Sequence, residues 1–211
     1  MLLGICRAAR KQMHGTGAGI TMMGRDGWRG VIAATGPLSE RLEELQFVCG
    51  EGPCIDAVRL GHPVLVDDLE DRLWRDWTGY APAAQAAGVR AVFAFPIQVG
   101  AARIAVLDVY RDVAGPLTGD ELADGLVFAD FALDALLDGQ QSAPAGHSPA
   151  GMEDAFDYRI YQAQGMVSVQ LQIDLLEAMA RLRAHAWGSQ LRLGDVADDV
   201  LAGSLHLDKD R

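Results

Sequence analysis

The sequence lacks both a long hydrophobic run and an excess of positive charge. No stretch approaches the roughly 18 consecutive apolar residues that a membrane-spanning helix needs, so we expect neither membrane insertion nor secretion. The 18 basic residues are outnumbered by 29 acidic residues, which gives a net charge of −11. Because non-specific binding to nucleic acids and anionic membranes requires positive potential, any nucleic-acid contact has to be small and local.

Cysteine is scarce as well. Cys6, Cys49 and Cys54 form no CxxC pair and have no histidine at metal-ligand spacing beside them, so the pattern predicts neither a disulfide framework nor a metal site. This usage is typical of a reducing, cytoplasmic compartment. Cys54 follows Pro53 at a predicted helix start, where the helix dipole favours a thiolate. The sequence leaves open whether Cys54 has a redox role or is a small buried residue.

The motifs of common enzyme classes are also missing. There is no GxSxG or HExxH string and no glycine-rich phosphate loop after a strand, and the five histidines are scattered. Asp67, Asp68 and the histidines offer acid–base groups outside any such motif. We therefore expect a non-catalytic protein whose sequence requires no cofactor.

One change of composition divides the chain. Half of all residues are hydrophobic, but residues 138–152 are rich in Gly, Pro, Ser, Ala and Gln and lose the periodic apolar pattern. Such a composition is typical of an interdomain linker. We predict a first unit over residues 1–137 and a second unit over residues 153–211, with no repeat relating them.

The first unit alternates strand-like and helix-like segments. The two strongest strand signals, residues 89–99 and 103–110, flank a short Gly-containing turn and predict a hairpin. Pro96 removes one ladder donor, so we expect an edge or a bulge there. Further strands are expected at 18–23, 30–35 and 63–67, a turn at 24–27, helices at 2–13, 38–48, 53–61 and 118–137, and a helical or irregular crossover at 69–87. This order predicts an antiparallel sheet with flanking helices, an α+β fold.

Apolar residues at helical spacing predict three helices in the second unit, at 154–170, 174–188 and 193–202. Asp174 and Glu177 have the spacing of an N-terminal capping box. Because a domain of this size buries a low fraction of its surface, we expect it to self-associate or to dock on the first unit.

Short strings in both units are recognisable. In the first unit they are 50–58 (GEGPCIDAV), 63–68 (PVLVDD) and 89–96 (VRAVFAFP), and these GAF-like segments resemble a bacterial GAF sensory domain. In the second unit they are 163–167 (AQGMV), 170–171 (QL), 177–178 (EA), 182–184 (LRA) and 196–197 (VA), and these ANTAR-like motifs resemble an ANTAR RNA-binding domain. In this order around a linker, the two units resemble the GAF-ANTAR regulators of actinobacteria.

This resemblance implies a GAF fold followed by a three-helix, all-α ANTAR fold. It also implies transcription antitermination, in which ANTAR dimers bind paired stem-loops in nascent RNA and prevent a terminator hairpin from forming. We therefore expect a cytoplasmic homodimer whose GAF unit senses a small molecule or a redox signal and whose ANTAR unit binds RNA. The alternative is a protein-interaction adaptor in which the helical unit is a dimerisation module.

Candidate RNA contacts lie on the first two predicted helices of the second unit. Gly165 costs about 1 kcal/mol relative to alanine inside a helix, which indicates a close approach by RNA, by a partner helix or by a neighbour in the bundle. Residues 153–211 hold ten acids and six bases, so recognition by shape, stacking and arginine planes is favoured over bulk charge. The candidates are Arg159, Ala163, Gln164, Gly165, Ser168, Gln170 and Arg183, and Tyr161 and Trp187 either stack on bases or pack in the core.

A small-molecule pocket is predicted in the first unit, between the sheet and its helices. Its lining would be Phe93, Phe95 and Leu107, with Trp74 and Trp77 over its mouth. The alternative is that these large apolar side chains fill the core.

Overall fold

The computed structural model describes residues 1–23, 29–72, 77–141 and 157–208. The chain forms two compact units, Met1–Phe156 and Asp157–Arg211. Helix α6 (Gly119–Gln141) continues four residues into the predicted linker. The remainder of that linker and the predicted turn at 24–27 lie outside the described residues.

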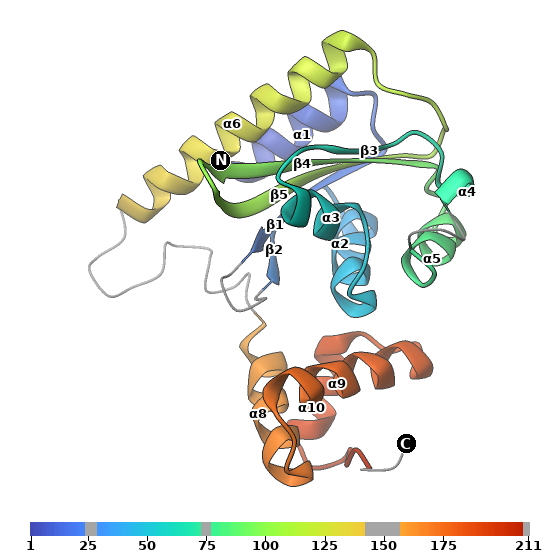
Figure 1. Ribbon diagram of the computed structural model, residues 1–211, viewed down its shortest axis with the longest axis vertical. Helices are drawn as coiled ribbons and strands as arrows, with labels where there is room; N and C mark the ends of the chain where they lie inside the picture. Colours follow the sequence, from blue (N-terminus) through green and yellow to red (C-terminus); the bar gives the residue numbers. More distant parts are fainter. Residues whose placement is uncertain (24–28, 73–76, 142–156, 209–211) are drawn as a thin grey trace. The chain divides into compact units, whose positions relative to one another are not determined.

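The first unit is built on one five-stranded sheet (Figure 1). Its strands are β1 (Gly17–Met23), β2 (Arg29–Ala34), β3 (Val64–Val66), β4 (Ala91–Val99) and β5 (Ala102–Arg111). They lie in the order β2-β1-β5-β4-β3, and every neighbouring pair is antiparallel. The predicted α+β fold is therefore confirmed, and the predicted hairpin is the β4–β5 pair.

Pro96 lies where β4 loses one of its neighbours. Strand β3 pairs with β4 only from Val92 to Ala94, so within the described part of the sheet β4 has no partner on that side at Pro96. The pairing register with β5 shifts immediately afterwards, between Ile97 and Gln98. Because proline cannot donate to the ladder, this open edge accommodates it without the loss of a hydrogen bond to β3.

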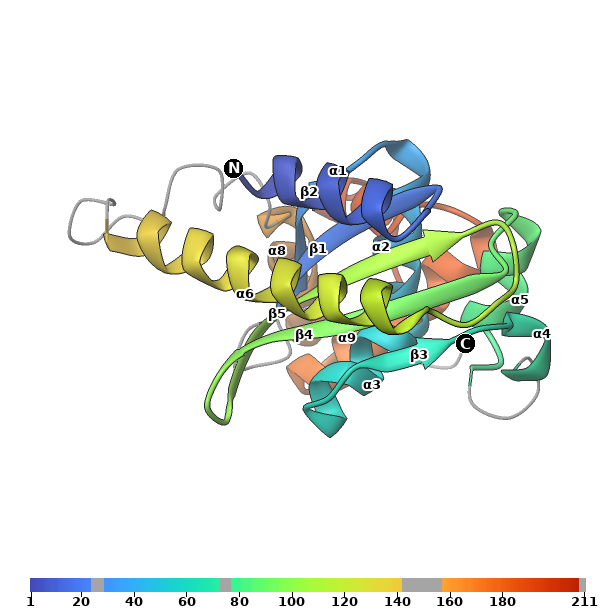
Figure 2. The same cartoon turned by 90° about the horizontal axis from the view of Figure 1, so that it is seen from above.

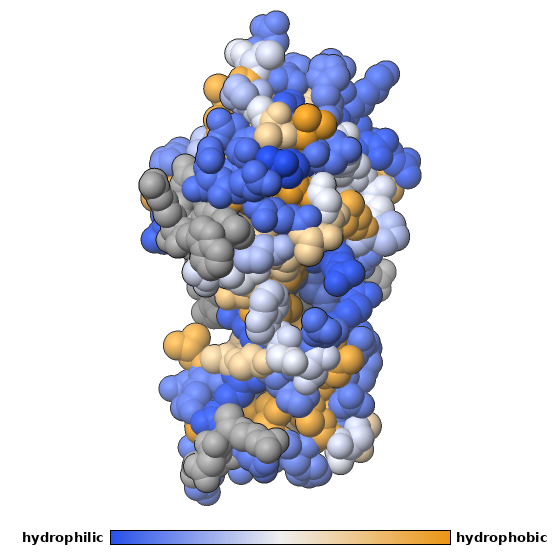
Figure 3. Space-filling model, turned by 90° about the vertical axis from the view of Figure 1, so that its right-hand side faces the viewer, coloured by the Kyte–Doolittle hydropathy of each residue, from blue (hydrophilic) through white to orange (hydrophobic). Residues whose placement is uncertain are grey.

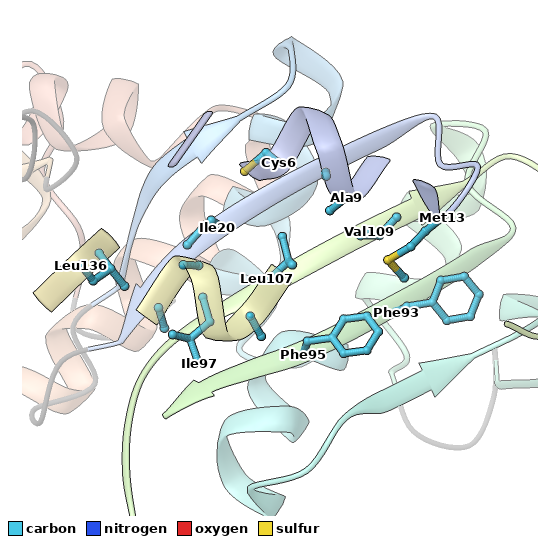
Figure 4. Close-up of a cluster of buried hydrophobic side chains, with 14 of the residues drawn as sticks. Cys6, Ala9, Met13, Ile20, Phe93, Phe95, Ile97, Leu107, Val109 and Leu136 are labelled. Carbon is cyan, nitrogen blue, oxygen red and sulfur yellow. The ribbon is translucent and has the colours of Figure 1, made fainter. Parts of the chain in front are cut away.

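Helices α1 (Leu2–Gln12) and α6 cover one face of the sheet and enclose the largest apolar core (Figures 1 and 2). Alternate residues of β4 and β5 point into this core, because side chains of a strand alternate between the two faces. Phe93, Phe95 and Leu107 are fully buried there (Figure 4). Helix α6 comes closest at Gly125, where a Cβ atom would overlap the ring of Phe95.

The opposite face of the sheet carries helices α2 (Pro37–Cys49), α3 (Pro53–Leu60) and α5 (Tyr80–Ala86), with the short helix α4 (Leu69–Arg72) beside α5. Proline occupies the first turn of both α2 and α3, where its missing N–H costs nothing. Each of these two helices ends at a glycine in the left-handed conformation, Gly50 and Gly61.

The inward face of α2 combines apolar and polar side chains. Leu42 and Phe47 are buried, whereas Leu38 near the start of the helix is 42% exposed. Ser39, Glu43 and Gln46 are buried as well. A polar layer therefore lies between α2 and the sheet.

The second unit consists of helices α8 (Tyr158–Leu171), α9 (Leu175–Ser189) and α10 (Leu193–Leu201). The predicted cap of α9 is confirmed, because the Asp174 carboxylate accepts the backbone N–H of Glu177 at 2.8 Å. No helix in the described ranges has the length and hydropathy of a membrane span. The bundle core consists of Ile160, Ala163, Val167, Leu171, Ala178, Met179, Leu182, Ala186, Leu193, Val196, Ala197 and Val200.

Candidate functional site

Polar side chains gather on the sheet face beneath α2 and α3, where an ordinary core would be apolar. This buried polar cluster consists of Thr21 from β1, Glu43 and Gln46 from α2, and Asp108 and Tyr110 from β5. Asp108 and Tyr110 are fully buried, and the other three are at most 4% exposed. A buried carboxylate is costly unless its oxygens find partners, so the contacts of this cluster decide what it can do.

Local geometry explains how these residues meet. Asp108 and Tyr110 alternate along β5 with the apolar residues that face α1 and α6, so they point to the opposite side of the sheet. Glu43 and Gln46 are three residues apart and share one face of α2. Gly19 on β1 leaves the room that the Glu43 carboxylate occupies, since a Cβ atom there would overlap it.

Hydrogen bonds join the cluster across three elements. Both Glu43 carboxylate oxygens accept hydrogen bonds, one from the Thr21 hydroxyl at 2.7 Å and one from the Tyr110 hydroxyl at 2.8 Å.

The Gln46 amide bridges two further elements. Its Nε2 donates to Asp108 Oδ2 at 2.7 Å, and its Oε1 accepts the backbone N–H of Cys54 at 2.8 Å. Gln46 thereby ties α2 to the first turn of α3 and to β5.

The two carboxyl groups of the cluster hold a proton more firmly than ordinary carboxyls. Burial raises the pKa of Glu43 to about 7, against the opposing effect of hydrogen bonds from Thr21 and Tyr110. Burial also raises the pKa of Asp108 well above its usual value, and the neighbouring charge of Glu43 raises it further. Both carboxyl groups therefore favour their protonated form more than exposed carboxyls do.

Two buried oxygen atoms of this region have no hydrogen-bond partner within the described residues: Asp108 Oδ1 and the hydroxyl of Tyr80. Tyr80 begins α5 and is fully buried. The pKa of its phenol is raised well above 10, first by burial and then by the nearby charges of Asp108, Glu43 and Cys54. Such unpaired groups are rare in native proteins and call for a structural explanation.

A thiol adjoins the carboxyl pair. The Sγ atom of Cys54 and carboxylate oxygens of Glu43 and Asp108 all lie within 4.8 Å of one another, and all three residues are buried. None of the three cysteines is in a disulfide. The arrangement therefore brings sulfur and oxygen donors from α2, α3 and β5 to one point.

The structure does not bring the predicted pocket residues together. Phe93, Phe95 and Leu107 fill the core on the α1 and α6 side of the sheet. Trp77 belongs to a separate core cluster on the α2 and α5 side, where its ring lies edge-on to Tyr80 with centroids 6.1 Å apart. Trp74 lies outside the described residues. Phe93, Phe95 and Leu107 therefore do not line one pocket with Trp77, because the two groups belong to clusters on opposite faces of the sheet.

The residues of the buried polar cluster were not among the predicted site residues. A signal was present in β5, where Asp108 interrupts an otherwise apolar run from residue 104 to 109. A charged residue in the middle of a buried strand is informative, because it is costly unless it has a role. The contribution of Glu43 and Gln46 carried no such signal, since polar residues are common on helices that face solvent.

In the helical unit, Ala163 is corrected from an RNA contact to a core residue. It is fully buried between the helices, so RNA cannot reach it. Arg159 forms ion pairs with Asp157 and Asp198. A Cβ atom added at Gly165 would meet nothing within 4 Å, so the bundle itself makes no close approach there.

Two further candidates hold the α8–α9 junction. Gln164 Nε2 donates to the carbonyl of Leu175 at 2.6 Å, and the Ser168 hydroxyl donates to the carbonyl of Ile173 at 2.6 Å. Gln170 is exposed, and Arg183 is half-buried. Of these two, Gln170 is therefore the more accessible to a partner.

One face of α9 exposes apolar side chains. The exposed apolar residues that recur there at helical spacing are Leu176, Ala180, Ala184 and Trp187. Together with the half-buried Arg183 on the same face, we call them the α9 stripe. Leu176 is 82% exposed and Trp187 is 47% exposed. Figure 3 shows hydrophobic side chains reaching the surface of the helical unit among hydrophilic ones. Exposed apolar groups of this kind mark interaction surfaces.

A family model described as GAF domain matches residues 1–136. Among solved structures, the chain is similar to the GAF domain region of a protein from Geobacter sulfurreducens PCA, with 15% identity, a TM-score of 0.54, and coverage of 65% of this chain and 91% of that one. It is also similar to a free methionine-R-sulfoxide reductase from Neisseria meningitidis in complex with its substrate, with 16% identity, a TM-score of 0.52, and coverage of 67% and 79%.

A third similar structure is the GAF domain of a phosphoenolpyruvate-protein phosphotransferase from Acinetobacter, with 10% identity, a TM-score of 0.51, and coverage of 67% and 82%. No curated protein matches the chain in sequence. At these identities the likeness concerns the fold, which the three proteins share with residues of the first unit.

Proposed function

Because the chain belongs to the GAF domain family, which indicates signal sensing, we propose that it is a signal-responsive regulator that binds RNA. In this proposal the GAF unit senses a small molecule or a redox signal, and the helical unit binds RNA stem-loops and controls transcription antitermination. The role is regulatory rather than catalytic, and it belongs in the cytoplasm, where nascent RNA is made. A homodimer would present two helical units to paired stem-loops.

One observation carries the RNA-binding half of the proposal. Seven of the nine apolar residues in the ANTAR-like motifs are buried in the core of the three-helix bundle, whereas Met166 is half-buried and Ala184 is exposed. The seven are Ala163, Val167, Leu171, Ala178, Leu182, Val196 and Ala197. Motifs whose apolar positions mostly serve one bundle fit a fold signature, which supports the resemblance from which the RNA-binding role follows.

The α9 stripe supports a small, local RNA contact. Trp187 offers an exposed ring on which an unpaired base can stack, and Arg183 lies one turn away on the same face. Stacking tolerates the acidic character of the unit better than phosphate contacts do, because it does not depend on bulk positive charge.

A titration of the full chain against a tandem stem-loop RNA tests the proposal, with a scrambled RNA of equal length as the control. The proposal predicts selective binding that weakens as salt rises, since some counterions are released. Equal affinity for both RNAs would remove the RNA-binding role. Turnover of free methionine sulfoxide, measured on the same sample, would instead point to an enzyme related to the methionine-R-sulfoxide reductases of the same fold.

A second candidate function is an adaptor in which the helical unit is a dimerisation module. The exposure of Val169, Leu175 and Leu176 around the α8–α9 junction favours it, because apolar groups at this density are typical of protein interfaces. Leu176→Glu would then convert a dimer to a monomer in sedimentation equilibrium. An RNA-binding unit without this interface would keep its mass after the substitution.

A further inference from the structure

The donor atoms of Glu43, Cys54 and Asp108 lie close enough together to be compared with the ligands of a metal ion. The three donor atoms lie within 4.8 Å of one another. In a tetrahedral zinc site, bond lengths of about 2.0–2.3 Å place neighbouring donors roughly 3.3–3.7 Å apart. Starting from separations of up to 4.8 Å, the donors need to move toward one another by about 1–1.5 Å to reach that spacing.

The hydrogen bonds around the donors have the form of outer contacts at a metal site. Asp108 Oδ1 has no partner within the described residues, while its other oxygen accepts from Gln46. Both oxygens of Glu43 are oriented by the hydroxyls of Thr21 and Tyr110. In metalloproteins, ligating carboxylates are held by hydrogen bonds of this kind.

The hydroxyl of Tyr80 is a second, independent observation. It is fully buried in the same side-chain cluster as Tyr110, whose hydroxyl contacts Glu43, and it has no hydrogen-bond partner within the described residues. A buried hydroxyl of this kind needs a partner, and a water or other ligand on a bound metal ion would supply one.

We propose that Glu43, Cys54 and Asp108 coordinate one divalent transition-metal ion of the zinc type. A thiolate excludes the hard cations Mg²⁺ and Ca²⁺, which prefer oxygen alone, whereas Zn²⁺ accepts sulfur and carboxylate oxygen together. The ion offsets the charge of the two carboxylates, whose hydrogen-bond partners within the cluster are the neutral side chains of Thr21, Gln46 and Tyr110.

Three protein ligands leave one position of a tetrahedral ion open. Zinc sites that bind an exchangeable ligand have three protein ligands, whereas structural zinc sites have four. In this proposal a signal molecule with a lone pair to donate binds the ion at the open position. This assignment of a ligand rests on the proposed sensory function. The metal site itself does not depend on RNA binding.

The test uses the full chain after removal of metals with a chelator, titrated with Co²⁺ as a spectroscopic probe and then with Zn²⁺. We expect one ion per chain, a thiolate-to-cobalt charge-transfer band in the near ultraviolet, and a rise of the thermal unfolding midpoint with Zn²⁺. The isosteric variants Cys54→Ser and Asp108→Asn should lose the ion. The affinity of these two variants for the metal ion should fall by more than the roughly 10–100-fold that follows the loss of a residue hydrogen-bonded to a metal ligand.

The matched control is Cys49→Ser, which changes a half-buried thiol that is not among the three donors. It should keep the charge-transfer band and the full affinity. Circular dichroism before the titration identifies a variant that does not fold, and Glu43→Gln then replaces it. An unchanged affinity in the folded variants, or the absence of any band in the unsubstituted chain, would overturn the site whatever the RNA titration shows.

Discussion

Gly19 on β1 lies against the carboxylate of Glu43 on α2, so closely that a Cβ atom at position 19 would overlap it. The buried acid and the missing side chain are therefore one feature of the fold. The glycine does not serve a left-handed backbone conformation, since it lies within a regular antiparallel strand. Its role is to make room for Glu43.

Gly19→Ala should destabilise the GAF unit, although alanine is the better strand residue. The added methyl group must displace a buried, hydrogen-bonded carboxylate, which costs about 1–3 kcal/mol. Urea denaturation measures the effect. Gly4→Ala in α1 is the control, because a Cβ atom there meets nothing within 4 Å and should stabilise the helix by about 1 kcal/mol. If Gly19→Ala and Gly4→Ala changed the free energy of unfolding in the same direction and by the same amount, the close contact between position 19 and Glu43 would be contradicted.

Gln46→Met should destabilise the unit by about 2–6 kcal/mol. It keeps the length of the side chain but leaves Asp108 Oδ2 and the Cys54 N–H buried without this partner, at about 1–3 kcal/mol each. The free energy of unfolding from urea titration checks this. Arg41→Met changes an exposed residue of the same helix and should have little effect. A loss below 1 kcal/mol for Gln46→Met would show that water replaces the amide.

The stability of the first unit should depend on pH through the ionisation of Glu121. Burial by itself would raise its pKa, but hydrogen bonds from the Thr118 N–H and His14 and the charge of Arg111 outweigh it, so the pKa is lowered. A lowered pKa contributes stability above the unfolded value of about 4.3, and this is lost as the pH falls through the folded value.

Glu121→Gln should therefore lower the thermal midpoint at pH 7, and the difference from the unsubstituted chain should shrink as the pH falls below about 4. Thermal unfolding followed by circular dichroism at a series of pH values measures the difference. Asp112→Asn, which removes an exposed carboxylate next to Arg111, is the control. A difference that stays constant with pH would show that Glu121 contributes packing rather than charge.

Trp187→Ala should weaken RNA binding while leaving the helical content intact. Loss of one stacked base costs about 1–3 kcal/mol, or roughly 5–150-fold in affinity. Fluorescence anisotropy with a labelled stem-loop RNA gives the affinity. Val169→Ala removes an apolar side chain that is 78% exposed but lies outside the α9 stripe, so it should bind as the unsubstituted chain does. Equal losses in both variants would argue for a general effect on the bundle.

Periodicity made much of the fold predictable. The helix predicted at 154–170 from apolar residues at helical spacing is α8, and Ile160, Ala163, Val167 and Leu171 form its buried face. The long apolar segments of β4 and β5 were recognisable for the same reason, since apolar residues in strands and helices recur with fixed periods. Local signals were sufficient wherever a residue's role depended on its neighbours along the chain.

The candidate site could not be predicted in the same way, because its members become neighbours only in three dimensions. Glu43 and Gln46 resemble solvent-facing residues until β1 and β5 are placed beneath them. Phe93 and Trp77 are both large and apolar, and nothing in the sequence shows that the sheet separates them. For Ala163 the sequence allowed either an RNA contact or tight packing in the bundle, and its burial at a helix crossing is a packing feature.

The most direct test of the central claim is single-round transcription in vitro from a template with a tandem stem-loop followed by a terminator. The protein is added at a concentration that saturates the stem-loop RNA in the titration. We predict that the fraction of transcripts reading through the terminator rises with the protein and returns to its basal value when the stem-loops are scrambled. Readthrough that does not change with the protein, on either template, would contradict an antitermination role.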